Sequence, residues 1–249
     1  MKRVVQSFLG AVAFLTRLPV PRRLEDVPGN FAGSTVFFPV VGLLVSGGAV
    51  LIHRLFSWFV PRSVMIAALL LFLVGITGGL HEDALADAAD GFGGGWNKDQ
   101  ILTLMRDSRV GSFGAVAIVL FLLARFVLLG EIPPQRLDGY LVAGQVACRW
   151  TAVPLAYFLS PARDQSGQGA RLAGRITAAS LIMGTLLAGI ILGVALRTNG
   201  LWVGLATIAV SVATGAYYRH RIGGVTGDCL GATIQLTEVA VYFTGVVLR

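Results

Sequence analysis

The stretch Gly78-Gly79-Leu80-His81-Glu82-Asp83-Ala84-Leu85-Ala86-Asp87-Ala88-Ala89-Asp90-Gly91 places four acids within nine residues of a chain that otherwise avoids charge. On a helix, Asp83, Asp87 and Asp90 point at about 0°, about 40° and about −20° and therefore share one face. Like charges at this spacing destabilise a helix unless a cation neutralises them. The stretch therefore predicts a cation-binding helix or, as the simpler alternative, a solvated acidic helix start that complements the helix dipole.

The ligands available on this face indicate which cation it would bind. All are hard oxygens, without a cysteine or second histidine nearby, which favours Mg²⁺ or Mn²⁺ over zinc. Asp83 and Asp90 lie about 10 Å apart along a helix axis, a long reach for one ion bound at about 2.1 Å. Two ions, or one ion on two neighbouring acids, fit better. We predict Asp83, Asp87 and Asp90 as metal ligands, and a helix-end hydrogen bond rather than metal ligation for His81.

Composition places the chain in a membrane. Of its 249 residues, 55% are hydrophobic and only 13% are charged, whereas soluble proteins have about 25% charged residues. We therefore expect an all-α, polytopic membrane helix bundle with six or seven spans, forming a single domain over residues 1–249. Residues 4–18 are short for a span of about twenty residues and predict an interfacial or re-entrant helix. The candidate spans, of which the last is doubtful because it contains two acids, are 35–56, 64–80, 110–130, 139–159, 176–196, 201–218 and 225–248.

Basic residues are divided unevenly between the two sides that these spans define. With a cytoplasmic N terminus, thirteen fall on one side: Lys2, Arg3, Arg17, Arg22, Arg23, Lys98, Arg106, Arg109, Arg163, Arg171, Arg175, Arg219 and Arg221. Five fall on the other: Arg54, Arg62, Arg136, Arg197 and Arg249. This bias predicts that the acidic stretch faces the cytoplasm. The net charge of +7 therefore reflects topology rather than nucleic-acid binding, since no basic run is interleaved with aromatic residues.

Further charged residues are candidates for substrate binding. Arg106 and Arg109, three apart, could grip a phosphate beside the metal or could anchor the topology. Asp107 between them is a further ligand or their ion-pair partner. Arg125 and Arg149 lie within apolar segments, where a charge pairs with an acid, binds an anionic substrate or, near a span end, extends to the interface.

The end of the chain repeats part of its centre. Gly223-Gly224-Val225-Thr226-Gly227-Asp228-Cys229-Leu230-Gly231 aligns with residues 78–86 at both glycines, the aspartate and the second leucine. Asp228 then occupies the place of Asp83, and Glu238 follows within the same apolar segment. Chance could produce this likeness in so glycine-rich a chain. If it reflects a structural repeat, both segments deliver an aspartate to one polar site and approach it from opposite sides.

These motifs, taken together, resemble the cobalamin synthase (adenosylcobinamide-GDP ribazoletransferase) family of bacteria. The resemblance rests on 78–91, on Arg106-Asp107-Ser108-Arg109-Val110-Gly111 and on 223–232, and extends to Phe14-Leu15-Thr16-Arg17-Leu18-Pro19 and Phe38-Pro39-Val40-Val41-Gly42. It covers nearly the whole chain in order. Ala84 and Gln235 depart from the family's pattern, where glycine and an acid are common.

The resemblance implies a multi-pass enzyme of the bacterial inner membrane whose site faces the cytoplasm. It would transfer the adenosylcobinamide phosphate of adenosylcobinamide-GDP to α-ribazole or its 5′-phosphate and release GMP, with one or two Mg²⁺ ions (Mn²⁺ as an alternative). We predict Asp90 or Asp107 as the catalytic base. The predicted substrate-binding residues are Arg106, Arg109, Arg149, His81 and Asp228. Membrane lipid is a further expected partner, an oligomer is possible, and nucleic acid is not expected.

Two other functions compete with this interpretation. A CDP-alcohol phosphotransferase carries a related aspartate motif, but Asp87-x-x-Asp90-Gly91 lacks the later pair of aspartates. A cation transporter would bind its ion near the middle of the membrane, whereas most of the acids here lie at a membrane edge beside basic residues.

Overall fold

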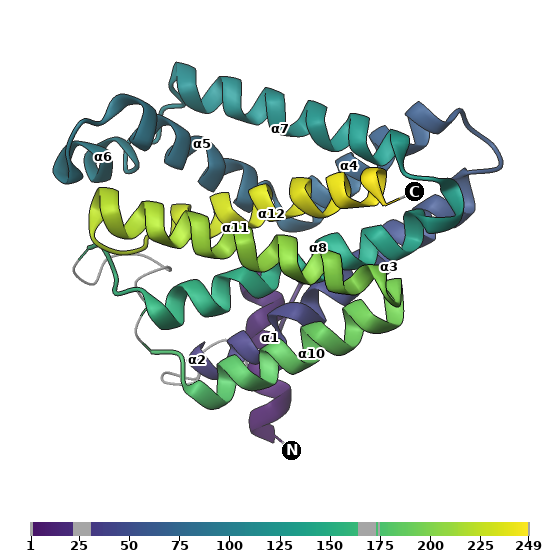
Figure 1. Cartoon of the computed structure of the whole chain (residues 1–249), viewed down its shortest axis with the longest axis horizontal. Helices are drawn as coiled ribbons and strands as arrows, with labels where there is room; N and C mark the ends of the chain where they lie inside the picture. Colours follow the sequence, from purple (N-terminus) through teal and green to yellow (C-terminus); the bar gives the residue numbers. More distant parts are fainter. Residues whose placement is uncertain (1, 22–30, 164–172, 174, 249) are drawn as a thin grey trace.

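The computed structural model describes residues 2–21, 31–163, 173 and 175–248, and this part of the chain is almost entirely helical. Its one β-type pairing in the described residues is an isolated bridge between Pro161 and Val225. The long helices lie side by side along one direction, and the N-terminal helix α1 runs across them (Figure 1). The prediction of an all-α helix bundle is confirmed.

Five helical segments in the described residues are long and apolar enough to cross a membrane. Two further helices, α4 (Arg62–Thr77) and α5 (Leu80–Gly94), add a sixth span if they form one broken span. The chain is therefore a multi-pass membrane protein, at the lower end of the predicted number of spans. The five are Thr35–Phe56, which contains α3 (Phe38–Phe56), and α7 (Ser112–Glu131), α10 (Ala178–Leu196), α11 (Asn199–Ile222) and α12 (Gly227–Val247).

The outer helices expose apolar stripes. On α7, Val116, Val119, Leu120 and Leu123 are exposed at the i, i+3, i+4, i+7 spacing of one helix face. An apolar stripe of this kind on the outside of a bundle is suited to lipid rather than to water.

The remaining predicted span forms α8 (Pro134–Phe158), which lies at the centre of the bundle. It packs against α3, α10, α11 and α12, and the seven consecutive residues 143–149 are all buried. Seven residues make about two helical turns, so this part of α8 is covered on every side. Because its neighbours shield it from lipid, α8 can carry Gln145, Arg149 and Pro154 within the bundle.

The N-terminal helix is short, as expected. α1 (Lys2–Leu15) has 14 residues and packs against α2 (Phe31–Ser34) and α3. After α1, the Arg17 N–H donates to the Ile76 carbonyl at 2.7 Å, which ties this segment to the end of α4. Of the basic residues used to predict the topology, four lie outside the described part: Arg22, Arg23, Arg171 and Arg249.

Two consecutive glycines produce the break between α4 and α5. Gly78 and Gly79 have φ values of 67° and 72°, in the left-handed region that favours glycine. Their N–H groups donate to the carbonyls of Gly75 and Val74 at 3.1 and 2.9 Å and so close α4. Because the chain turns here, α5 leaves at 84° to α4.

The connection from α11 to α12 is longer than the one between α4 and α5, and it is hydrogen-bonded to the segment that follows α8. Gly223, with φ of 74°, ends α11. The Val225 N–H donates to the Ser160 carbonyl at 2.9 Å, and the Ala162 N–H donates to the Val225 carbonyl at 3.0 Å. Thr226 then caps α12, because its Oγ1 accepts from the N–H of the third helix residue, Cys229, at 3.2 Å. The start of α12 is thus fixed beside the chain that follows α8.

Candidate active site

α5 and α12 pack antiparallel and very closely. Gln235 Nε2 on α12 donates to Glu82 Oε1 on α5 at 2.9 Å. Farther along α5 and nearer the start of α12, Gly231 faces Ala84, and a Cβ on Gly231 would collide with the Ala84 Cβ. Residue numbers therefore rise along α5 as they fall along α12, and the acidic face of α5 meets the first turn of α12. Figure 1 shows the two helices side by side.

Asp83, Asp87 and Asp228 form an acidic cluster at this meeting point. The Asp87 carboxylate is repelled by Asp83, Asp228 and Asp90, in decreasing order, and Asp228 is also repelled by Asp83. Asp83 is exposed, whereas Asp87 and Asp228 are half-buried. In the described residues, none of the three forms an ion pair within 4 Å. Asp83 and Asp228, 145 residues apart (228 − 83) in the sequence, therefore lie near enough in the fold to repel each other.

Asp90 has a structural role that the sequence did not reveal. Its Oδ2 accepts from the Gly111 N–H at 2.7 Å and its Oδ1 from the Gly114 N–H at 2.9 Å. These donors belong to the start of α7, where an acid satisfies otherwise unpaired N–H groups and complements the helix dipole. A Cβ at Gly111 or Gly114 would collide with this carboxylate. Asp90 therefore fixes the C-terminal half of α5 to α7, whether or not it also contacts a metal.

Arg163 lies beside the acidic cluster, on the segment that pairs with Val225. Its Nη2 donates to the Leu102 carbonyl at 2.8 Å, and its Nε is buried without a hydrogen-bond partner in the described residues. Burial lowers the pKa of Arg163, while attraction by Asp228 opposes that shift and repulsion by Arg106 adds to it. Arg163 is therefore a cation close to Asp87 and Asp228, and Arg106 lies close to Arg163.

Asp107 and Arg109 form an exposed pair of their own. Arg109 Nε and Nη2 donate to the two Asp107 oxygens at 3.0 and 2.7 Å. These hydrogen bonds lower the pKa of Asp107 to about 2, and the same pairing raises the pKa of Arg109. Of the two roles considered for Asp107, ligand or ion-pair partner, the structure shows the second.

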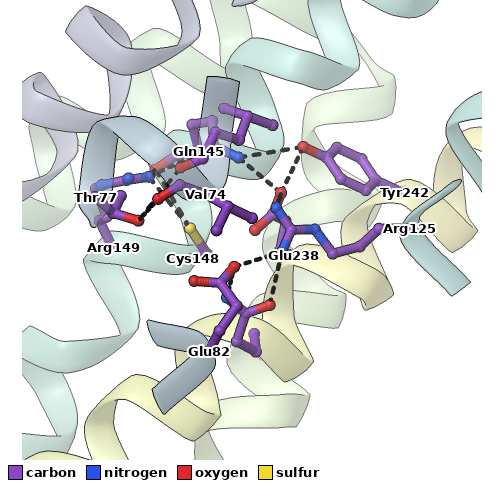
Figure 2. A network of polar contacts seen from close by, with 11 residues as sticks. Val74, Thr77, Glu82, Arg125, Gln145, Cys148, Arg149, Glu238 and Tyr242 are labelled. Atoms are coloured by element: carbon purple, nitrogen blue, oxygen red, sulfur yellow. Dashed lines mark hydrogen bonds and ion pairs between the residues drawn. The ribbon is translucent and has the colours of Figure 1, made fainter. Parts of the chain in front are cut away.

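Arg125 on α7 is the centre of a buried polar network (Figure 2). Its Nη1 donates to Glu82 Oε1 at 2.9 Å and to Gln235 Oε1 at 3.0 Å, and its Nη2 lies 3.2 Å from Glu238 Oε1. Arg125 is 1% exposed, and a buried cation is stable only when it is paired. Of the alternatives considered for this residue, the structure shows pairing with acids.

Gln145 on α8 extends the network to Arg149. Its Nε2 donates to Glu238 Oε1 at 2.8 Å, and its Oε1 accepts from Arg149 Nη1 at 2.6 Å. The Tyr242 hydroxyl also donates to Glu238, at 2.9 Å. Arg149 is buried, forms no ion pair within 4 Å in the described residues, and its Nε has no hydrogen-bond partner there. Two arginines and two glutamates balance the charge of the network as a whole.

His81 lies in the first turn of α5, close to both arginines of the network. It is buried, and within the described residues its Nε2 has no hydrogen-bond partner. The helix-end hydrogen bond expected for His81 is therefore not made by this nitrogen. Arg149 and His81 thus each present a buried nitrogen that a ligand could engage.

The acidic cluster provides some of the ligands that a hard cation requires. Its donors are carboxylate oxygens, which suit Mg²⁺ or Mn²⁺. Among the described residues, no group of three or more His, Cys, Asp and Glu is arranged to hold a metal ion. A cation here would therefore take further ligands from substrate or water.

A cavity of about 580 Å³ lies elsewhere, between α8, α10 and α11. Apart from Arg219 and a few hydroxyl groups its lining is apolar, with Trp150, Phe158 and Ile208 among its residues. It contains none of the acids described above. The charged site on α5 and α12 is therefore chemically the better candidate for reaction with a phosphorylated substrate.

Some of these site residues carry no local sequence signal. Arg163 is 65 residues from Asp228 (228 − 163), and the two come together where residues 160–162 pair with Val225. Glu82 does offer a clue, because it lies off the acidic face, about 100° from Asp83. An off-face acid in a membrane helix requires a partner on another helix.

Comparison with known proteins agrees with these observations. The chain matches the family described as cobalamin-5-phosphate synthase over residues 7–246. An adenosylcobinamide-GDP ribazoletransferase of Shewanella woodyi is 34% identical, covering 97% of this chain and 96% of the relative. Proteins of the same name from Ralstonia nicotianae and Acetivibrio thermocellus are 36% and 31% identical, covering 97% and 95% of this chain and 95% of each relative. No solved structure matches. The chain therefore belongs to the cobalamin-5-phosphate synthase family.

Proposed function

We propose that this protein is an adenosylcobinamide-GDP ribazoletransferase that completes the nucleotide loop of adenosylcobalamin. A hydroxyl oxygen of α-ribazole, or of its 5′-phosphate, attacks the phosphorus on the cobinamide side of the pyrophosphate. A new P–O bond forms, the P–O bond to the guanylyl phosphate breaks, and GMP leaves. The hydroxyl proton passes to a base. In such a transfer the protein contributes mainly by positioning and by neutralising charge.

This proposal rests on the juxtaposition of Asp87 with Asp83 and Asp228. The three carboxylates form no ion pair in the described residues and repel one another. A bound cation would offset this repulsion and let all three stay ionised beside each other. Asp83 and Asp87 would hold Mg²⁺, with Asp228 on the facing helix and Asp90 as a further predicted ligand. Bound Mg²⁺ supplies neutralisation of the pyrophosphate and of the departing GMP.

Arginines around the cluster suit the anionic groups of the substrate. Arg163 lies beside the carboxylates and Arg106 lies near Arg163, and both would bind non-bridging phosphate oxygens. The buried nitrogens of Arg149 and His81 would bind deeper substrate groups. Arg109 stays a predicted contact, although it is held by Asp107 here.

Asp90 and Asp107 were the predicted bases, and their surroundings distinguish them. A carboxylate with a pKa of about 2 is a weak proton acceptor at neutral pH. Both oxygens of Asp90 accept hydrogen bonds from α7, but a carboxylate has lone pairs for further donors. Asp90 is therefore the better of the two candidates.

We also propose that the site faces the cytoplasm from a bacterial inner membrane. The charge bias of the loops supports this orientation, and GDP-linked substrates and magnesium are available on that side. Lipid would surround the apolar outer faces.

The two competing functions fit less well. A lipid-making CDP-alcohol phosphotransferase is disfavoured by the full-length match to cobalamin-5-phosphate synthase. A cation transporter would need free acids in the interior of the bundle. The interior acids Glu82 and Glu238 are instead both paired with Arg125.

A direct assay tests the proposal. Membranes containing the protein are incubated with adenosylcobinamide-GDP, α-ribazole and Mg²⁺, and GMP and the corrinoid product are separated by chromatography. We expect stoichiometric formation of both, loss of activity with a chelator, and recovery on adding Mg²⁺. Asp87→Asn should lower the rate by about 100-fold or more, the size of effect expected when stabilisation of developing charge is removed.

The matched control is Asp99→Asn, which removes an exposed acid of α6 (Lys98–Leu104) and should leave the rate unchanged. Absence of GMP from the unaltered protein would refute the proposed reaction. Near-normal activity of Asp87→Asn at ordinary Mg²⁺ concentrations would refute only the metal role. Release of CMP from a CDP-linked lipid would point to the competing enzyme class.

A further inference from the structure

Within the buried network around Arg125, only Arg149 has a substrate-binding role in the function proposed above. Arg125 and Glu82 have none, yet their contact reaches the helix that carries the acids. Glu82 is the residue through which α5 hydrogen-bonds to it, and Glu82 directly precedes Asp83. Figure 2 shows Glu82 directed toward Arg125, with Glu238 and Gln145 beyond. The network therefore connects the first turn of α5 to α7, α8 and α12.

The contact at Glu82 fixes the rotation of α5 about its own axis. Glu82 Oε1 accepts one hydrogen bond from Arg125 Nη1 on α7 and one from Gln235 Nε2 on α12, both at 2.9 Å. Donors on two different helices hold this oxygen in place. Asp83 and Asp87 lie about 100° and about 140° around the helix from Glu82. Their direction is therefore set once Glu82 is held.

Without this contact, the first turn of α5 would be poorly constrained. α5 begins after two left-handed glycines, and Gly79 provides no side-chain cap. Repulsion between Asp87 and its neighbours Asp83 and Asp228 favours rotation of α5 away from α12. The bond of Asp90 to α7 holds the opposite half of the helix. Glu82 and Asp90 thus attach α5 to α7 at two points, two turns apart.

We infer that Glu82 and Arg125 are positioning residues, whose contact sets the rotation of α5 and holds Asp83 and Asp87 toward Asp228. The inference rests on the proposed function, in which these acids bind the cation and the pyrophosphate. A misplacement of about 1 Å in a catalytic group can lower a rate by about 100-fold. Arg125 and Glu82 therefore act through the acids and do not need to contact substrate.

Two substitutions of one residue separate positioning from other roles. Glu82→Gln keeps the side-chain length and an oxygen that can accept from both donors, but removes the charge. Glu82→Asp keeps the charge but shortens the reach by one methylene. If Glu82 acts by positioning, Glu82→Asp should lower kcat per folded enzyme by about 10-fold or more and raise the Mg²⁺ concentration for half-maximal activity. Glu82→Gln should stay within about threefold of the unaltered protein.

A second measurement tests the orientation of α5 relative to α12 without relying on enzyme activity. Cysteines replace Asp87 and Asp228 in a chain whose Cys148 and Cys229 are changed to alanine, and the rate of cross-linking by a short bifunctional thiol reagent is followed. Adding Glu82→Asp or Arg125→Met should slow cross-linking by about fivefold or more. The repulsion between Asp87 and Asp228 is absent from this chain, so the slowing would come only from the loss of the contact that holds the rotation of α5. This measurement stays informative even if the unaltered protein releases no GMP.

The matched control is Asp138→Asn, which removes an acid paired with His53 and Arg54 at 2.6 and 2.8 Å, between α3 and α8. It should change neither kcat per folded enzyme nor the cross-linking rate. The inference is overturned if Glu82→Gln is the more damaging substitution, because the charge or the proton would then matter. It is equally overturned if both variants keep the normal kcat per folded enzyme and cross-linking is unchanged.

Discussion

Acids of two kinds lie within about three turns of each other on α5 and on α12. Glu82 and Glu238 are both paired with Arg125 inside the bundle. Asp83, Asp87 and Asp228 have no ion-pair partner within 4 Å in the described residues, and they lie where α5 meets the first turn of α12. Buried carboxylates are stable only with a partner, whereas carboxylates reserved for a ligand must stay available. The same pair of helices thus carries a structural set of acids and a functional set.

The largest effect on stability is expected from removing a structural acid. In Glu238→Leu, Arg125 loses one of its two carboxylates, and the Gln145 and Tyr242 donors lose their acceptor. The free energy of unfolding should fall by about 3–5 kcal/mol. Thermal unfolding of the purified protein in detergent would measure the loss. Glu238→Gln, which keeps an acceptor, should cost much less; equal melting of Glu238→Leu and the unaltered protein would contradict the structural assignment.

An intermediate effect on stability is expected from a change in the close contact between α5 and α12, which lies between the two sets of acids. Gly231→Ala would place a Cβ against the Ala84 Cβ and separate α5 from α12, at a cost of about 1–3 kcal/mol. The reciprocal change, Ala84→Gly, should restore most of the stability in the double variant, although alone it costs about 1 kcal/mol in a helix. Thermal unfolding of the unaltered protein, the two single variants and the double variant completes a double-mutant cycle. Additive losses in the double variant would show that the two residues do not touch.

The smallest effect on stability is expected from a functional acid. Asp228→Asn removes repulsion from Asp83 and Asp87 and breaks no ion pair, so the free energy of unfolding should stay within about 0.5 kcal/mol of its original value or rise slightly. The Mg²⁺ concentration for half-maximal activity should nevertheless increase, because a carboxylate near the cation is lost. A loss of stability as large as that of Glu238→Leu would remove the distinction between the two sets.

The local sequence predicted much of the fold for a simple reason. Apolar segments of about twenty residues have few alternatives to membrane-spanning helices, and seven such segments correspond to α3, α4, α7, α8, α10, α11 and α12. The boundaries near 78–80 and 223–227 were visible because left-handed glycines end α4 and α11. The likeness of these two segments, if it reflects a structural repeat, also led us to expect Asp83 and Asp228 at one site.

The likeness did not predict that the two helices begin differently. α5 starts directly after Gly79, so Asp83 is its fourth residue, whereas α12 starts at Gly227 and Asp228 is its second. The difference arises because Val225 is drawn into hydrogen bonds with Ser160 and Ala162. That contact joins distant parts of the chain, which no local pattern reveals.

The sequence by itself determined the membrane bundle, the clustering of acids on one face of a helix and the resemblance to the family, because each depends on residues close together along the chain. Only the tertiary structure decided which acids are paired inside the bundle and which stay available for a ligand. Glu82 is one residue from Asp83, yet packing of α5 between α7 and α12 directs the first to Arg125 and the second to the cluster. The packing of the helices likewise places Arg163 close to Asp228 and directs the Asp90 carboxylate to the N–H groups at the start of α7. A side chain's partner depends on helices packed from distant parts of the sequence, and that information exists only once the chain has folded.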